Sequence, residues 1–153
     1  MKKQKSIGNK GFSLVELIIV IAIMAILIGV MAPQLLRYVE RTRVSSDTQL
    51  ADTVKTAVTT AILDPTNLDD PNYQSAISTL TGGVTLNNVP EPFMDDVAET
   101  LGETALDATW ASANLKSNGA SNISIQMTGT NKVTVTVVGS HADGGNGDAI
   151  VVE

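Results

Sequence analysis

The residue whose chemistry stands out in this sequence is Glu16, a carboxylate near the start of a long apolar segment. From Phe12 that segment runs for 21 residues, and only Ser13 and Glu16 interrupt it. A charged side chain at the centre of a membrane helix costs about 2.5–3.5 kcal/mol on insertion scales, and less near the helix end. We therefore expect Glu16 to need a proton or a cationic partner.

The remaining ionisable side chains offer little chemistry. The only histidine, His141, has no evident catalytic partner, and Asp69-Asp70 and Asp95-Asp96 are typical of solvated loop charges. The run Asp143–Asp148 could supply oxygen ligands to calcium, but its spacing does not fit an EF-hand, so a flexible glycine-rich turn is the preferred interpretation. The sequence contains no nucleophile–base pair, phosphate loop or HExxH element. We predict no catalytic residue, no metal site and no cofactor, and hence no enzyme.

Charge is distributed unevenly along the 153 residues. Four of the ten basic residues lie in the first ten positions, and no acidic residue precedes Glu16. A chain cut after Gly11 would keep six basic and 16 acidic residues, a net charge of −10, which disfavours binding to nucleic acid. Cysteine is absent, so disulfides and thiolate sites are excluded.

The apolar segment is expected to be a membrane helix. As a helix, its 21 residues would span about 32 Å, one hydrocarbon core. The lysines before it predict a single pass with the N-terminus in the cytoplasm. A secretory signal peptide is the alternative, but the apolar run is longer than is usual and Pro33 would directly follow the cleavage site.

The helix is predicted to continue in amphipathic form to Leu63, because Asp64-Pro65 ends it. A helix from Phe12 to Leu63 would be about 78 Å long. Pro33 removes one backbone hydrogen bond inside it, with Gly29 one turn earlier, and marks either a tolerated kink or a segment that melts on leaving the lipid. The apolar stripe, interrupted in its middle by two charged side chains, consists of Leu36, Val39, Arg43, Asp47, Leu50, Val54, Ala57, Val58, Ala61 and Ile62.

The rest of the chain is predicted to form a small α+β head. Short helices are expected at 72–80, 91–101 and 103–116, with Trp110 covering a small core. Residues 122–128 and 132–138 alternate with period two and predict an antiparallel hairpin around Gly129-Thr130-Asn131, with a third strand at 149–152. The fold class is a long N-terminal helix packed on a small antiparallel sheet. The expected domains are a basic leader (1–11), a transmembrane and assembly helix (12–33), its amphipathic half (34–63) and the head (64–153).

The segment Lys10-Gly11-Phe12-Ser13-Leu14-Val15-Glu16 resembles the signature of the type IV prepilin family, a basic residue, Gly, Phe, Ser or Thr, Leu, any residue and Glu before an apolar helix. The resemblance covers about residues 1–35. It implies that a prepilin peptidase cuts after Gly11 and methylates the new amino terminus of Phe12. It also implies that Glu16 meets the Phe12 amine of a neighbouring subunit. From the residues alone, Glu16 could instead reach the interface or pair with its own Phe12 amine.

The resemblance leaves three function classes open. The first is a type IV pilus subunit, which passes from the cytoplasmic membrane to an extracellular filament with the help of an assembly ATPase and a platform protein, and which serves adhesion, motility or biofilm formation. The second is a pseudopilin of a type II secretion or competence DNA-uptake system. Residues Asp143–Asp148 loosely resemble the calcium-binding loop of secretion pseudopilins. The third is a single-pass anchored binding protein that never polymerises.

Overall fold

The computed structural model describes residues 11–65, 69–129, 132–139 and 149–153, and it divides the chain into two compact units, Met1–Arg37 and Tyr38–Glu153. One helix, α1 (Leu14–Leu63), runs through both units. It ends where Asp64-Pro65 was predicted to end it, and it begins two residues later than Phe12. In the first unit the described residues are Gly11 to Arg37, all of them exposed.

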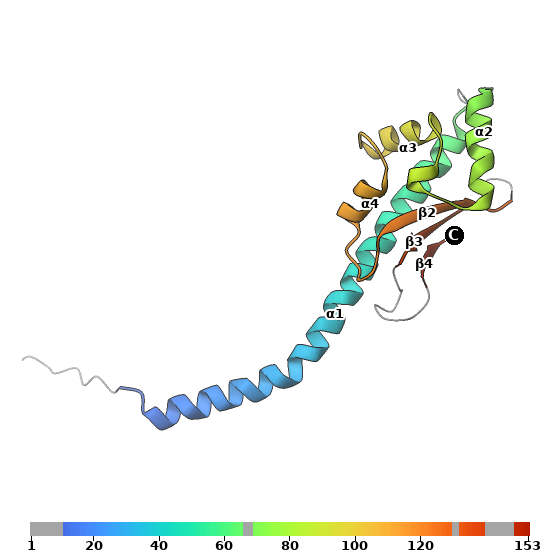
Figure 1. Ribbon diagram of the computed structural model, residues 1–153. Coiled ribbons are helices and arrows are strands. Elements are labelled where there is room, and N and C mark those ends of the chain that lie inside the picture. Colours follow the sequence, from blue (N-terminus) through green and yellow to red (C-terminus); the bar gives the residue numbers. More distant parts are fainter. Residues whose placement is uncertain (1–10, 66–68, 130–131, 140–148) are drawn as a thin grey trace, which may run out of the picture. The chain divides into compact units, whose positions relative to one another are not determined.

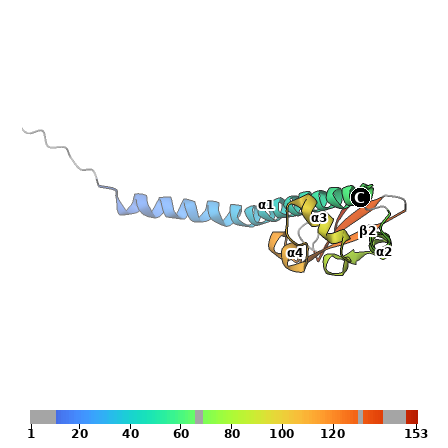
Figure 2. The same ribbon diagram turned by 90° about the horizontal axis from the view of Figure 1, so that it is seen from above.

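The second unit packs a four-stranded antiparallel sheet and three short helices against the C-terminal half of α1 (Figures 1 and 2). The strand order is β1-β2-β3-β4, so each strand pairs with its neighbour in the sequence. The strands are β1 (Val84–Thr85), β2 (Asn122–Met127), β3 (Val133–Val138) and β4 (Ile150–Val152). The α+β fold class predicted from the sequence is confirmed.

The hairpin predicted by period-two alternation is present as β2 and β3, in a register that pairs Asn122 with Val138 and Met127 with Val133. Every second side chain therefore enters the core: Ile123 and Ile125 from β2, and Val133, Val135 and Val137 from β3 are all buried. Residues 130 and 131 of the predicted turn lie outside the described residues. The third predicted strand is β4, and β1 adds a short strand that the sequence analysis did not predict.

Three short helices and two 3₁₀ turns cover the rest of the core. They are α2 (Pro71–Thr79), η1 (Leu80–Gly82), η2 (Leu86–Asn88), α3 (Phe93–Leu101) and α4 (Ala108–Asn114). The predicted helix at 103–116 is too long at both ends, because Gly102 takes a left-handed conformation after α3 and Asp107 caps α4 by accepting from the Trp110 amide at 2.8 Å. Trp110 packs against the core as expected, and its indole N–H is buried without an acceptor among the described residues.

The buried stripe of α1 begins later than the sequence pattern predicted. Leu36, Val39 and Arg43 are exposed, and the first buried residue is Val44. From there the core contacts of α1 recur every three or four residues, as a helix packed on a sheet requires. The members of this stripe are Val44, Asp47, Ala51, Val54, Ala57, Val58, Ala61 and Ile62.

Candidate assembly site

The predicted site residues gather at the start of α1, where a capping interaction fixes the first turn. Gly11, Phe12 and Ser13 lie outside the helix, and Leu14 is its first residue. The Glu16 carboxylate (Oε2) accepts a hydrogen bond of 2.9 Å from the Ser13 backbone N–H. A serine before the helix and a glutamate three residues later are the residue types of a capping box, and here the glutamate side chain accepts from an amide that the helix leaves unpaired. Glu16 thus has a partner within its own chain, although not the Phe12 amine considered above.

The two residues flanking the predicted cleavage site make no packing demand on their own chain. Phe12 is 91% exposed, and a Cβ built on Gly11 would meet nothing within 4 Å. The fold of this chain therefore does not itself require glycine at position 11. A requirement for glycine there would have to come from a protein that acts on this segment.

The apolar surface of α1 is uncovered from its first residue to Val39. All 29 residues from Gly11 to Val39 are exposed, including every large apolar side chain among them. Along the described chain, α1 is a helix long and apolar enough to cross a membrane. Between Glu16 and Arg37 lie 20 residues without a charge, about 30 Å of helix and so one hydrocarbon thickness.

Pro33 lies inside this uncovered segment, and Gly29 is four residues before it. Proline has no N–H to donate, so the Gly29 carbonyl loses its usual helical donor. A Cβ built on Gly29 would meet nothing within 4 Å. The two residues therefore weaken the same helical hydrogen-bond position, and no packing contact within the described chain compensates for it.

Further along α1, two carboxylates hold the turn that leads into β2. Asp47 is completely buried, and its two oxygens accept from the backbone N–H groups of Lys116 at 2.8 Å and Ser117 at 2.7 Å. Seven residues earlier in α1, Glu40 Oε1 accepts a hydrogen bond of 2.6 Å from the Asn118 N–H. In the sequence, Asp47 is one of the two charged side chains that interrupt the apolar stripe. The structure gives the reason for this charge in the stripe: the Asp47 carboxylate replaces the hydrogen bonds that two of these amides would otherwise lose, and Glu40 does the same for the third.

The same turn is fixed on its other side by a close approach of two glycines. Gly119 and Gly139 have φ values of +83° and +79°. A Cβ on Gly119 would come within 2.5 Å of the Gly139 carbonyl oxygen, so a larger residue would collide with backbone. The end of β3 is thereby locked against the turn held by Glu40 and Asp47.

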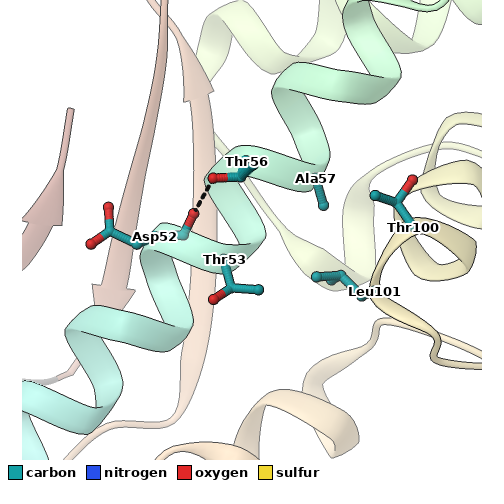
Figure 3. A pocket seen from close by; sticks show the side chains of 6 residues that line it. All are labelled: Asp52, Thr53, Thr56, Ala57, Thr100 and Leu101. Atoms are coloured by element: carbon teal, nitrogen blue, oxygen red, sulfur yellow. Dashed lines mark hydrogen bonds between the residues drawn. The ribbon is translucent and has the colours of Figure 1, made fainter.

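Hollows on the second unit line up along one side of α1. One of about 360 Å³ lies between α1 and the end of α3, where Thr100 and Leu101 face Ala57 (Figure 3). The Asp52 carboxylate at its rim points away from Thr100 and Leu101 (Figure 3). A second, of about 440 Å³, is lined only by α1 residues between Tyr38 and Gln49.

The other candidates named from the sequence form no ligand site in the part of the chain that the structure describes. Asp70 caps α2 by accepting from the Asn72 amide at 2.8 Å, and no group of three metal-ligating side chains occurs among the described residues. The pKa of Glu91 is raised above its ordinary value of 4.5, chiefly by a hydrogen bond with the Asp95 carboxyl, with burial and the Asp95 charge adding to it. His141 and Asp143–Asp148 lie outside the described residues.

The chain is similar to a known family at its N-terminus and to several fimbrial proteins. Residues 8–32 match the family described as the prokaryotic N-terminal methylation motif. The type IV major fimbrial protein FimA of Dichelobacter nodosus is 33% identical over 98 residues, which cover 64% of this chain and 59% of that protein. A fimbrial protein of Moraxella nonliquefaciens is 47% identical over 53 residues, covering 35% of this chain and 34% of the relative. A fimbrial protein of Pseudomonas aeruginosa is 42% identical over 57 residues, which are 37% of each chain.

The matched segments thus span between about a third and three fifths of the length of these relatives. No solved structure matches the chain at a comparable level. The match to the methylation motif lies on the part of the chain that holds Gly11, Phe12, Glu16 and most of the uncovered apolar helix. The methylation motif and the similarity to type IV fimbrial proteins, together with a long apolar N-terminal helix and a small antiparallel sheet, support the assignment of the chain as a type IV pilin-like protein.

Proposed function

We propose that this chain is the structural subunit of a type IV pilus, cut after Gly11, methylated at Phe12 and polymerised through its N-terminal helix. The observation that carries the proposal is the uncovered run of 29 residues from Gly11 to Val39. An apolar surface of this length has to be covered by something other than its own chain. The bilayer covers it first, and helices of identical subunits cover it in the filament.

Lipid is already apolar, so moving the helix from the bilayer into a bundle gains little from the hydrophobic effect. Packing between helices and charge neutralisation must therefore supply the free energy that favours the bundle. After cleavage the Phe12 amine is a new positive charge beside the helix N-terminus, where the helix dipole disfavours cations. The Glu16 carboxylate of a neighbouring subunit neutralises this charge when the two subunits are in register. Extraction from the bilayer then falls to an assembly ATPase and its platform protein.

The capping box provides a sharp test of this charge pairing. Glu16→Gln keeps an oxygen that can accept from the Ser13 amide, since glutamine also serves in capping boxes, but it removes the charge. Glu16→Ala removes both. We expect both variants to be inserted and to start at Phe12 by mass spectrometry, and both to yield few surface fibres when imaged with an antibody to residues 64–153. Normal fibre yield from Glu16→Gln would show that the cap, and not the charge, is what assembly needs.

The same experiment separates the other function classes. A purified wild-type chain that keeps its leader lysines and remains monomeric would be an anchored binding protein. Short filaments confined to the cell envelope would identify a pseudopilin of a secretion or DNA-uptake system. Long surface fibres would agree with the proposal, and a role in adhesion, motility or biofilm formation would then follow from the phenotype of a deletion strain.

A further inference from the structure

One face of α1, just beyond its apolar segment, forms a groove whose side chains are hydrogen-bond donors without a carboxylate. Its lining residues recur at three- and four-residue steps and so share one face of the helix. The groove has a volume of about 440 Å³ and is lined by Tyr38, Arg41, Thr42, Ser45, Ser46 and Gln49. We call it the Arg41 groove.

Charge in this groove is positive and unopposed. Arg41 is exposed and makes no hydrogen bond or ion pair with any described residue, whereas Arg43, two residues on, pairs with Glu40 at 3.5 Å. A second cation approaches from the turn after α4, where Lys116 Nζ lies 3.3 Å from Ser46 Oγ. The acidic residues of this stretch, Glu40 and Asp47, bind the turn at 116–118 instead.

The position along the helix indicates what fills the groove. The 20 charge-free residues between Glu16 and Arg37 match one hydrocarbon thickness, so Arg37 falls at the far border of the bilayer core. Tyr38 follows at the level where aromatic side chains are enriched at membrane interfaces, and it is 70% exposed. Arg41 comes one helical turn after Arg37, about 6 Å further along the helix, which is within the headgroup layer.

We propose that, while the subunit resides in the membrane, the Arg41 groove binds the phosphate of a phospholipid headgroup in the outer leaflet. A guanidinium presents paired donors that match two phosphate oxygens, and the hydroxyls of Ser45 and Ser46 can donate to the remaining ones, whereas Thr42 already donates to the Tyr38 carbonyl oxygen. Anionic headgroups such as phosphatidylglycerol are favoured over zwitterionic ones, because the groove contains no carboxylate to pair with an amine. The contact fixes the depth of the helix.

The inference depends on the membrane-spanning stage and not on polymerisation. A chain that binds lipid in this groove but never forms fibres would contradict the proposed function alone. A chain that forms fibres but does not bind lipid here would contradict this inference alone.

The test uses the full chain in neutral detergent micelles, titrated with short-chain phosphatidylglycerol while the amide resonances of Thr42, Ser45 and Ser46 are followed by NMR. We expect saturable shifts at these amides. Arg41→Gln should weaken the affinity about tenfold, the size of effect expected for losing a charge-assisted hydrogen-bonded pair. Arg43→Gln is the matched control, because it also removes one positive charge, but from a side chain that lies outside the groove, two residues from Arg41. It should weaken the affinity by less than about twofold.

Three outcomes would overturn the inference. Equal losses in Arg41→Gln and Arg43→Gln would mean general attraction between cations and an anionic micelle. Equal saturation by inorganic phosphate would mean a free-anion site and no recognition of lipid. Shifts that follow protein concentration rather than lipid would mean that the groove receives a carboxylate of a second copy. Circular dichroism of both variants verifies that α1 is intact.

Discussion

Replacing Asp47 with alanine tests whether a buried carboxylate holds the head onto α1. The substitution removes both oxygens that accept from the Lys116 and Ser117 amides. Ser117 is itself buried, and Asp47 is completely buried, so water cannot easily replace the lost acceptor. The variant would leave backbone donors unpaired at the entrance to β2.

The expected loss can be worked from these two hydrogen bonds. Hydrogen bonds to a charged group contribute about 1.5–3 kcal/mol each, and a buried donor left without a partner costs about 1–3 kcal/mol. We therefore expect Asp47→Ala to lower the free energy of unfolding by about 3 kcal/mol, against a total of about 5–15 kcal/mol for a typical domain. Asp47→Asn keeps one acceptor oxygen but turns an NH₂ toward the other amide, so we expect a loss of about 2 kcal/mol.

The assay is urea unfolding of the full chain in neutral micelles, monitored by the fluorescence of Trp110, the only tryptophan. With a slope of about 2 kcal/mol/M, a loss of 3 kcal/mol lowers the urea midpoint by about 1.5 M. Asp52→Ala is the matched control on the same helix, because Asp52 is exposed and should change the stability by less than about 0.5 kcal/mol. If Asp47→Ala and Asp52→Ala shift the midpoint equally, the carboxylate does not hold the turn.

Two further predictions concern the head. Gly102 and Gly119 both have positive φ, but of the two only a Cβ at position 119 would meet backbone, 2.5 Å from the Gly139 oxygen. In thermal unfolding we therefore expect Gly102→Ala to lower the free energy of unfolding by about 1 kcal/mol and Gly119→Ala to lower it by at least twice that. Equal losses would mean that the close approach relaxes at little cost. The pKa of Glu91 is raised in the folded state, so the folded chain binds the Glu91 proton more tightly than the unfolded chain does. The stability that this binding contributes is present below pH 4.5 and is lost as the pH rises through the raised pKa. Glu91→Gln should therefore stabilise the fold slightly at pH 7, by less than about 0.5 kcal/mol because the group is so exposed, and this gain should vanish near pH 4. A gain that does not depend on pH would contradict the interaction between Glu91 and Asp95.

The parts of the fold that were predictable from sequence are those fixed by local patterns. Alternation in 122–128 and 132–138 predicted the β2–β3 hairpin, because every second side chain had to enter the core. Asp64-Pro65 predicted the end of α1 for an equally local reason. The start of α4 was misplaced because Glu103 and Asp107 both precede helix-forming residues, and only the structure shows which of them caps the helix.

The parts that could not be predicted depend on partners distant in sequence. Asp47 accepts from amides 69 and 70 residues away, so within its own helix it looked like a misplaced charge. Strand β1 has two residues, too few for any period to appear. Among the site residues, Gly11 and Phe12 came from the motif alone, whereas Glu16 also stood out as a carboxylate inside the apolar segment. The Ser13–Glu16 hydrogen bond could have been inferred from their spacing, since serine followed three residues later by glutamate before an apolar run is the signature of a capping box.

The carboxylates of Glu40 and Asp47 also have a mechanical consequence. They are seven residues apart, about 10 Å along the helix, and together they accept hydrogen bonds from three successive backbone amides, Lys116 to Asn118. A pulling force applied along α1 would load these three bonds simultaneously, in shear, instead of opening them one by one. In a fibre under tension, load carried by α1 would reach each subunit's sheet through these three hydrogen bonds.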